Sequence, residues 1–289
     1  MLYQNKPLLG MKLTLCSAAI CVGIWQCQAG PTPSVTLTDG NSVALIDTSS
    51  QAGMFNWSVN GINQLNQQWF WFRTGSAGPE HSIDTLGAPT IVSGGAKSAT
   101  VTYTSSGQFS ISTTYTLRGG APVTSGASDI GESIVIDNLS SAQLDFHFFQ
   151  YADFSLGGTP ANDRTQLGVS GISGLFNEAA VWDSALSLTE NVGTSAIPGA
   201  NHGEVAAIGT TLGELNDANP TTLSDVAGAL GPSHNTWALE WDLQIANGGS
   251  AIISLDKNLQ TVLVPEPSSL ALISLGLIGY GLRRRKLTA

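Results

Sequence analysis

Alternation of large apolar residues with small or polar ones constrains the fold of this chain more than any other feature. From Trp237 to Ile245 every odd position is large and apolar, and every even position is small or polar. Successive side chains of a β-strand point to opposite faces, so this period of two predicts a strand with one buried face. The same pattern recurs over residues 99–104 and 109–117. The period near 3.6 that marks a helix is almost absent over residues 34–263.

Two further runs predict strands of a different character. The run Gln68–Arg73 is apolar on both faces, which indicates a strand in the centre of a sheet. The run Leu144–Tyr151 alternates but shifts its phase at Phe149, which predicts a β-bulge at that residue.

Many short strands separated by turn residues predict an all-β fold. Runs of the same type are expected as strands at Val35–Thr38, Val43–Asp47, Ile134–Asp137, Ala179–Asp183 and Ala251–Asp256. Clusters of Gly, Asn, Asp, Ser and Pro separate them, as in antiparallel sandwiches. We therefore expect one antiparallel β-sandwich domain over residues 30–262, jelly-roll or supersandwich-like. The less regular stretch 157–225 is expected to form long loops at one end of it.

The charge distribution limits the partners of this domain. The 289-residue chain holds 11 basic and 21 acidic residues. Residues 30–264 contain only five of the basic residues but 20 of the acidic ones, a net charge of −15. Such a surface repels phosphate backbones, so nucleic acid is excluded as a partner. Divalent cations and neutral glycans are compatible with it.

The N-terminal segment has the layout of a secretory signal peptide. Lys12 precedes an apolar run that extends to Trp25, and small residues follow it. Cleavage after Ala29 would make residues 1–29 the signal peptide and Gly30 the first residue of the exported chain. The segment then interacts with the Sec export machinery and signal peptidase. Met1 and Met11 both remain open as the true start, and a buried core helix remains the alternative to a signal peptide.

All cysteines of the chain lie within that same segment, at Cys16, Cys21 and Cys27. Removal of the segment would leave a protein without a thiol, which excludes disulfides, thiol catalysis and cysteine-ligated zinc from the exported domain. Lipoprotein processing at one of the cysteines is a weaker alternative, because none of them follows the usual small residues.

The C-terminus, residues 263–289, contains three parts in a fixed order. The tripeptide Pro265, Glu266 and Pro267 favours an extended backbone, because proline lacks an amide donor and disfavours helix before it. An uncharged run follows over residues 268–282, predicted as a transmembrane segment. As a helix it would span about 22 Å, which is short for a hydrocarbon core of about 30 Å. The cations Arg283, Arg284, Arg285 and Lys286 follow, and the positive-inside rule places them in the cytoplasm.

This order of motif, apolar run and basic cluster resembles the PEP-CTERM sorting tail of Gram-negative bacteria. The resemblance implies that a membrane-embedded, exosortase-like enzyme recognises Pro265, Glu266 and Pro267, and that residues 283–286 act as a cytoplasmic stop signal. It also implies export across the inner membrane, transient anchoring by the tail, and delivery to the cell surface or extracellular matrix. Such proteins typically occur in bacteria that make extracellular polysaccharide, which is a further expected partner.

Several residues of the central domain are candidates for chemistry. Glu240 and Asp242 share one face of the best-defined strand, at a spacing that paired carboxylates use in glycoside hydrolysis. Asp145 and His147 also share a strand face, and His202 lies two residues before Glu204, so that each pair offers metal ligands. For all of them, a solvated sheet face is the competing interpretation.

Loop residues and aromatic residues supply the remaining candidates. The pairs Asn162–Asp163 and Asn216–Asp217, with Asn219, are weak candidates for calcium, because neither matches a complete calcium-binding loop. No other cofactor is predicted. Most tryptophans occupy alternating positions and are expected in the core, whereas Trp182 lies in the less regular region and is the tentative glycan contact.

Three hypotheses on function follow from these patterns. The favoured one is a structural or adhesive surface protein of a biofilm or exopolysaccharide matrix, sorted by an exosortase-type system and without catalysis. The second is a secreted carbohydrate-binding module or glycan-active enzyme on a β-sandwich. The third is a plain membrane-anchored protein. No P-loop, dinucleotide fingerprint or Ser-His-Asp order supports a different enzyme class.

Overall fold

The computed structural model describes residues 31–32, 34–193 and 199–261. The predicted signal peptide (1–29) with its cleavage site at Ala29 and Gly30, the sorting motif Pro265–Pro267, the apolar run 268–282 and the cations 283–286 lie outside these ranges. Among the described residues, no helix has the length and apolar character needed to cross a membrane.

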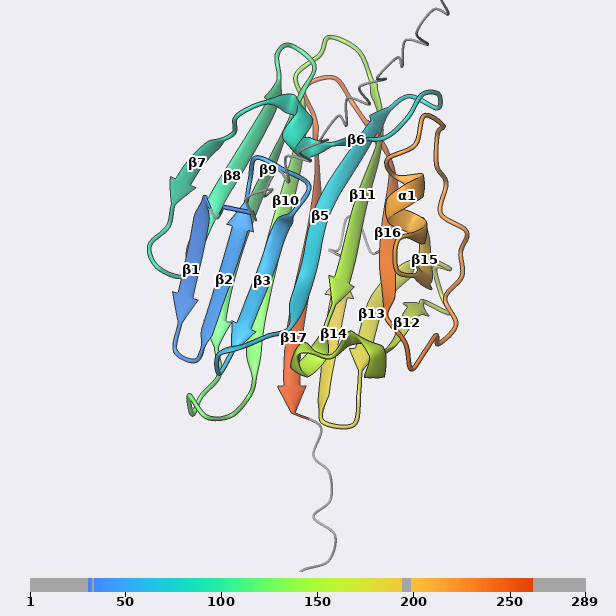
Figure 1. Cartoon of the computed structure of the whole chain (residues 1–289). Helices are drawn as coiled ribbons and strands as arrows, with labels where there is room; N and C mark the ends of the chain where they lie inside the picture. The colour runs from blue at the N-terminus through green and yellow to red at the C-terminus, as the bar shows by residue number, and fades with distance from the viewer. Residues whose placement is uncertain (1–30, 33, 194–198, 262–289) are drawn as a thin grey trace, which may run out of the picture. The chain divides into compact units, whose positions relative to one another are not determined.

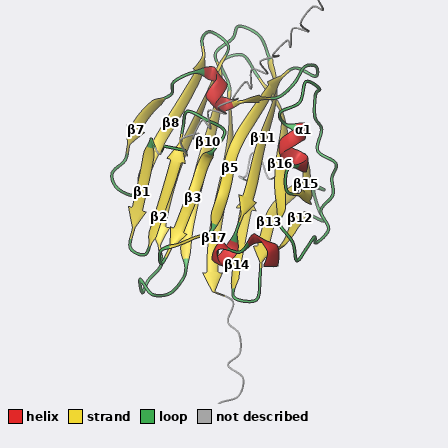
Figure 2. Ribbon diagram, viewed as in Figure 1, coloured by secondary structure: helices red, strands yellow, loops and turns green. Residues whose placement is uncertain are grey.

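The described residues form two sheets that pack face to face, antiparallel except for the short parallel pairing of β3 with β5 (Figures 1 and 2). We call them sheets A and B. Sheet A carries two short additional strands, β4 (Ile62–Asn63) and β6 (His81–Ser82), at β3 and β5. Its main strands, in spatial order, are β1 (Val35–Asp39), β2 (Ser42–Asp47), β3 (Gly53–Val59), β5 (Leu65–Thr74), β11 (Leu144–Phe154), β16 (Asn235–Ile245) and β15 (His202–Ala207).

Sheet B contains eight strands and lies behind sheet A in Figure 1. Its strands, in spatial order, are β12 (Arg164–Val169), β13 (Phe176–Trp182), β14 (Leu186–Val192), β17 (Ser250–Thr261), β10 (Ser128–Asn138), β9 (Phe109–Gly119), β8 (Ser98–Ser105) and β7 (Thr90–Ser93). The last described strand, β17, therefore lies inside the sheet, between β14 and β10.

Helices contribute little to the described part of the chain. The 3₁₀ turns Ile83–Leu86, Leu156–Gly158 and Pro160–Asn162 and the short helix α1 (Thr210–Glu214) connect strands (Figure 2). The prediction of an antiparallel β-sandwich is confirmed, and every strand expected from the sequence is present, most of them longer than expected.

Aromatic side chains fill the space between the sheets. Phe72 of β5 stacks on Phe146 of β11, with ring centroids 5.9 Å apart. Phe109 of β9 meets Phe146 from the opposite sheet at 5.0 Å. Edge-to-face and offset contacts of this kind add to the burial of apolar area. The prediction that β5 is a central strand is confirmed, because it is the fourth of the seven main strands of sheet A.

The predicted bulge at Phe149 is wrong. Residues 146–152 of β11 pair in unbroken register with β16 on one side and with β5 on the other. Phe149 points to the outer face of sheet A, opposite to Phe148, and is buried there all the same. The apparent shift in phase arises because part of the outer face is covered, so that both faces of β11 need apolar residues.

The expectation that residues 157–225 form long loops is also wrong, although the strand expected within this stretch at Ala179–Asp183 is present as β13. This stretch supplies β12, β13 and β14 to sheet B and β15 to sheet A. These strands are short and rich in Gly, Ser, Thr and Asn, so their period of two is weak in the sequence.

An irregular segment covers part of the outer face of sheet A. We call residues 215–234, which follow α1 and lead into β16, the strap. Figure 1 shows α1 and this segment, in orange, beside β15 and β16 on the viewer's side of the sheet. Leu215 and Leu223 of the strap are buried. Trp71 and Tyr151, in edge-to-face contact at 6.2 Å on that outer face, are also fully buried.

Candidate functional site

Three buried carboxylates of the sandwich hold the strap by accepting its backbone N–H groups. Glu80 accepts from Thr221 at 2.9 Å, Glu240 from Leu223 at 2.9 Å, and Glu204 from Ser224 at 3.1 Å. Hydrogen bonds to a charged acceptor are stronger than neutral ones and satisfy backbone donors in a segment without regular structure. The strap is therefore fixed to the sheet through side chains.

Arg73 strengthens this attachment at the centre of the sheet. Its Nη1 lies 2.7 Å from Glu80 Oε1 and donates to the Thr221 carbonyl at 3.0 Å. Both side chains of the ion pair are buried, and the guanidinium lies over the Phe149 ring at 6.0 Å. A buried pair of this type tolerates the loss of neither partner, because the remaining charge would be desolvated and unpaired.

Beside the strap, six side chains form what we call the acid–histidine cluster. Strand pairing places His147 of β11 between Arg73 and Asp242, and His202 of β15 opposite Glu240. All lie on the outer face of sheet A, because the inward positions of these strands hold the aromatic core. The members of the cluster are Asp145, His147, His202, Asp225, Glu240 and Asp242.

Asp242 stands between the two imidazoles of this cluster. Its Oδ1 lies 2.5 Å from His147 Nδ1, and its Oδ2 lies 3.6 Å from His202 Nε2. On the far side of His202, Nδ1 lies 3.1 Å from Asp225 of the strap. His147 also faces Glu240, with 3.7 Å between Nδ1 and Oε1. Each histidine therefore faces more than one carboxylate.

Glu240 has the chemical character of an acid–base group but is closed to solvent. Burial, with a smaller contribution from the Asp242 carboxylate, raises the pKa of Glu240 to about 7, and the hydrogen bond from the Leu223 N–H group partly opposes this shift. Its side chain is only 1% exposed, compared with 37% for Asp242. Its Oε1 atom and His147 Nε2 are buried without a hydrogen-bond partner. A substrate would reach this pair only after the strap moves.

The cluster also has the donor set for a divalent cation. His147, Glu240 and Asp242 each offer one ligand atom, and these atoms lie within 4.8 Å of one another. One nitrogen and two oxygen donors suit a borderline cation such as Zn²⁺. Within the described residues, these are the three potential metal-ligating side chains whose ligand atoms lie close enough together to share one ion.

The structure thus brings together most of the candidates that the sequence placed in separate pairs. Glu240, Asp242, Asp145, His147 and His202 meet in one cluster, whereas Glu204 holds Ser224 and Thr211 instead. Sequence reasoning missed Asp225 and the pair of Arg73 with Glu80. Asp225 lies in the strap, where no periodicity marks it, and the pairing of residues 73 and 80 depends on tertiary contacts alone.

The loop and tryptophan candidates lie elsewhere. Asp163 accepts the Leu156 N–H at 2.9 Å, and burial raises its pKa to about 7. Asn216 accepts from Gln51 at 2.7 Å, and Asp217 accepts the Asn219 N–H at 2.6 Å. Their side chains are thus engaged within the chain. Trp182 is half-buried at the end of β13, and its role as a glycan contact stays a prediction. The tryptophans expected in the core are buried there, namely Trp57, Trp69, Trp71, Trp237 and Trp241.

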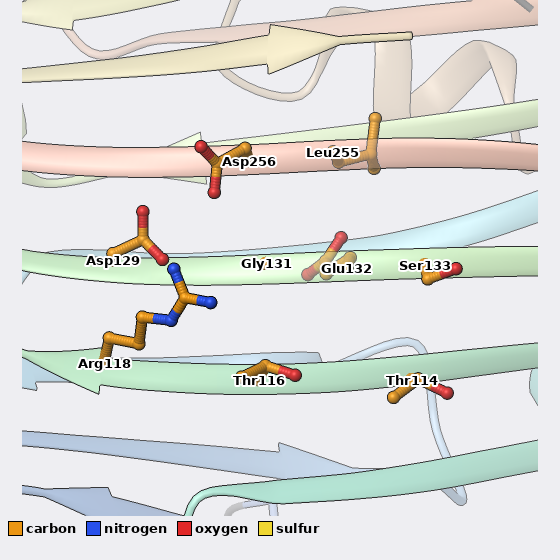
Figure 3. A pocket seen from close by; sticks show the side chains of 9 residues that line it. All are labelled: Thr114, Thr116, Arg118, Asp129, Gly131, Glu132, Ser133, Leu255 and Asp256. Carbon is orange, nitrogen blue, oxygen red and sulfur yellow. The ribbon is translucent and has the colours of Figure 1, made fainter. Parts of the chain in front are cut away.

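A second polar region lies on the outer face of sheet B. A hollow of about 230 Å³ lies over β9, β10 and β17. Figure 3 shows its lining residues, with the Arg118 guanidinium reaching toward Asp129 and no side chain at Gly131. Burial raises the pKa of Asp129, and the nearby Asp256 carboxylate, which shares a hydrogen bond with it, adds to the shift. The hollow is lined by polar residues but by no histidine, and its lining includes Glu132, whose Oε1 is buried without a hydrogen-bond partner.

Comparison with known proteins identifies the C-terminal tail. Residues 263–286 match the family described as the PEP-CTERM protein-sorting motif. The chain therefore carries the C-terminal sorting tail of exosortase substrates, which implies export and membrane anchoring before processing by a membrane enzyme. No curated protein matches the sequence of the chain.

Solved structures share the fold of the described domain at very low sequence identity. A bacterial glucoamylase complexed with acarbose is 10% identical, with a TM-score of 0.54 over 86% of this chain. The chain spans only 35% of that protein. A putative aldose 1-epimerase from Escherichia coli K12 is 11% identical, with a TM-score of 0.52 over 78% of this chain and 98% of the other. A galactose mutarotase-like protein from Lactobacillus casei is 9% identical, with a TM-score of 0.50 over 78% and 99%. These likenesses show a common fold.

Proposed function

We propose that this chain is an exosortase-sorted surface protein whose sandwich has a structural or adhesive role in the extracellular matrix. The observation that carries the proposal is the sorting motif at residues 263–286. Residues 1–29 would direct export through the Sec machinery, and signal peptidase would cleave after Ala29. The burial of Glu240, whose side chain is only 1% exposed, supports a role without catalysis, because a general acid or base must reach the substrate.

Mass spectrometry of the mature C-terminus tests the sorting step. In a host that contains an exosortase, we expect the tail to be cut near Pro265–Pro267, so that residues 283–289 are missing from the exported protein. The change Glu266→Ala should leave the tail intact and the protein in the membrane fraction. Glu178→Ala, which removes an exposed glutamate of β13, is the matched control and should be processed normally. A mature wild-type protein that still ends at Ala289 would support the plain membrane anchor instead.

A second candidate function is recognition of carbohydrate at the acid–histidine cluster. Its outer members Asp145, His202, Asp225 and Asp242 are partly exposed and present carboxylates and imidazoles, which bond readily to sugar hydroxyls. The fold shared with proteins described as a glucoamylase and an aldose 1-epimerase is consistent with such a ligand. This role would also suit a matrix protein that contacts extracellular polysaccharide.

A glycan array with the mature protein tests this second candidate. We expect binding that Asp242→Ala reduces at least tenfold and that Glu178→Ala leaves unchanged. Exchange of aldose anomers, followed by NMR, tests catalysis on the same samples. If the wild-type protein accelerates the exchange and Glu240→Gln does not, the second candidate function becomes enzymatic activity and not binding alone. If the protein neither binds a glycan nor accelerates the exchange, the second candidate is contradicted and only the structural or adhesive role remains.

A further inference from the structure

The core between the two sheets contains a charged network at its centre. Lys257 of β17 lies with its Nζ 2.9 Å from Glu132 Oε2 and 3.0 Å from Glu190 Oε2, and all three side chains are fully buried. Two glutamines of sheet A complete the network, because Gln68 donates to Glu132 at 3.0 Å and Gln150 donates to Glu190 at 3.2 Å. No water-accessible surface remains on the three charged side chains.

Strand register fixes these groups against one another. Glu190 of β14 is the direct cross-strand partner of Lys257, and Glu132 lies on β10, which borders β17 on its other side. All three occupy inward positions of their strands, as shown by the buried neighbours Leu188, Ile130 and Leu255. Rigid, packed strands thus hold one amine between two carboxyl groups.

This network is unbalanced for a set of simple ion pairs. It contains one lysine and two carboxyl groups, and the atoms Glu132 Oε1, Glu190 Oε1, Gln68 Oε1 and Gln150 Oε1 have no hydrogen-bond partner. Lys257 Nζ is close to both carboxyl groups but also lacks a partner with hydrogen-bond geometry. Several kcal/mol are lost for each ion that is taken out of water, and a second unpaired carboxylate would add to that cost. Burial raises the pKa of Glu190 to about 7, so this carboxyl is largely protonated below neutral pH, although Lys257 partly opposes the shift.

Lys257 is thus held between the largely protonated carboxyl of Glu190 and the carboxyl of Glu132, and none of the three side chains is exposed. Burial alone would lower the pKa of Lys257, but Glu132 and Glu190 outweigh it and raise that pKa. To become nucleophilic despite this raised pKa, the amine must give up a proton, and the nearest acceptor is Glu132, whose Oε2 lies 2.9 Å from Nζ. That transfer changes no net charge in the core. Fixed neighbours of this type react with very high effective concentrations.

We propose that Lys257 and Glu190 condense within the folded core to form an amide cross-link, with Glu132 as the proton carrier. The lone pair of Lys257 Nζ attacks Cδ of the protonated Glu190 carboxyl and forms the C–N bond. The C–O bond to the hydroxyl breaks, and this hydroxyl leaves as water with one proton that Glu132 returns. The remaining surplus proton of the amine stays on Glu132. Ammonium, carboxylic acid and carboxylate thus become amide, water and carboxylic acid, with no oxidant and no change in total charge.

The bond would join β14 to β17, the strand that precedes the sorting tail. It would close a covalent loop between residues 190 and 257 in a domain whose described residues contain no cysteine. A cross-link that closes a loop restricts the unfolded chain and so stabilises the folded state. It would also remove the charges of Lys257 and Glu190 from the core.

Mass spectrometry of the purified, folded protein tests this proposal directly. We expect an intact mass lower than the sequence mass by one water, and no cleavage by trypsin after Lys257, because the modified side chain is no longer a substrate. The peptides that contain residues 190 and 257 should appear as one branched species. Lys97, which contacts Asp39 at 2.8 Å but is exposed, is the internal control and should be unmodified. A folded protein of full sequence mass, with free Lys257 in its tryptic peptides, would overturn the proposal.

Three variants separate the bond from a purely structural role of the network. Lys257→Met should abolish the mass deficit. Glu190→Gln should form the same amide with the loss of one ammonia relative to its own sequence mass. Glu132→Gln should retain full mass while it stays folded, since no group then accepts the proton. Circular dichroism verifies the fold of each variant. A Glu132→Gln protein that cross-links as fast as the wild type would exclude Glu132 as the proton carrier.

Discussion

Gly53, at the start of β3, occupies a position where a side chain has no room. Its φ of +56° lies in the left-handed region, and a Cβ atom would overlap the Trp69 ring and the Gln68 carbonyl oxygen. We expect Gly53→Ala to lower the free energy of unfolding by about 3 kcal/mol, because backbone strain and overpacking add. Urea denaturation measures the change.

Gly61 is the matched control, because its φ is +80° but nothing lies near the added Cβ. Gly61→Ala should cost about 1 kcal/mol, from backbone strain alone. Equal losses in the two variants would show that the Trp69 contact does not limit this position.

The sequence contains a recognisable signal for the buried charges of Lys257, Glu132 and Glu190, but none for the acid–histidine cluster on sheet A. Lys257, Glu132 and Glu190 each interrupt an inward row of aliphatic residues, for example Leu255 and Leu259 around Lys257. This interruption is a sequence signal for a charged group in the core. The convergence of His147 with Asp242 had no comparable signal, because the order of strands in the sheet brings them together and periodicity does not report strand order.

At the scale of elements, the strap depends on side-chain acceptors, since it lacks strand or helix hydrogen bonding over most of its length. Glu204 accepts both the N–H and the hydroxyl of Ser224. We expect Glu204→Ala to raise amide hydrogen exchange at least tenfold in peptides from residues 215–234, while peptides from β10 and β17 stay protected.

Asp225→Ala serves as the control for this measurement, because Asp225 is an exposed strap residue that bonds to His202 and to the Gly203 N–H. It should change exchange only near residue 225. If Glu204→Ala accelerated exchange throughout the sandwich, the strap would be part of the cooperative core and not a separate covering element.

Strand existence was predictable from the sequence, whereas the covering of sheet A was not. The runs around Trp237–Ile245 and Phe109–Leu117 gave β16 and β9 directly, because one face of each needed a full apolar row. In the stretch 157–225, β13 was expected at Ala179–Asp183, but β12, β14 and β15 were not, since small polar residues fit an edge or a covered surface without strict alternation. The strap gave no signal at all, because its position depends on three carboxylates that are distant in the sequence, namely Glu80 before β6, Glu204 on β15 and Glu240 on β16.

For the whole molecule, carboxyl groups with raised pKa values contribute to the dependence of stability on pH, among them Asp163, Glu240 and the Glu190 of the buried network. Asp163 and Glu240 both have a pKa of about 7 in the folded state, well above their ordinary values of 3.8 and 4.5. At pH values between the ordinary pKa values and about 7, the folded chain therefore binds more protons than the unfolded chain. The stabilisation they give is therefore full below about pH 4 and is lost as pH rises through about 7.

We expect the melting temperature to be highest near about pH 5 and to fall toward about pH 8. Below that maximum, Asp39 and Asp47, whose pKa values are lowered by hydrogen bonds in the folded state, lose their contribution as they are protonated. The double variant Asp163→Asn with Glu240→Gln should flatten the decline between about pH 5 and 8. Differential scanning calorimetry across this range provides the measurement, and an unchanged slope would contradict the assignment.

The position of β17 decides how the sandwich resists a pull from the membrane. β17 pairs with β10 over ten residue pairs and with β14 over seven. While the sorting tail is still tethered, tension along it acts parallel to a strand that is bonded on both sides. Such a load shears many hydrogen bonds at once, whereas an edge strand would peel away one bond at a time. The domain can therefore bear traction at its tail end and remain folded until the protein is released.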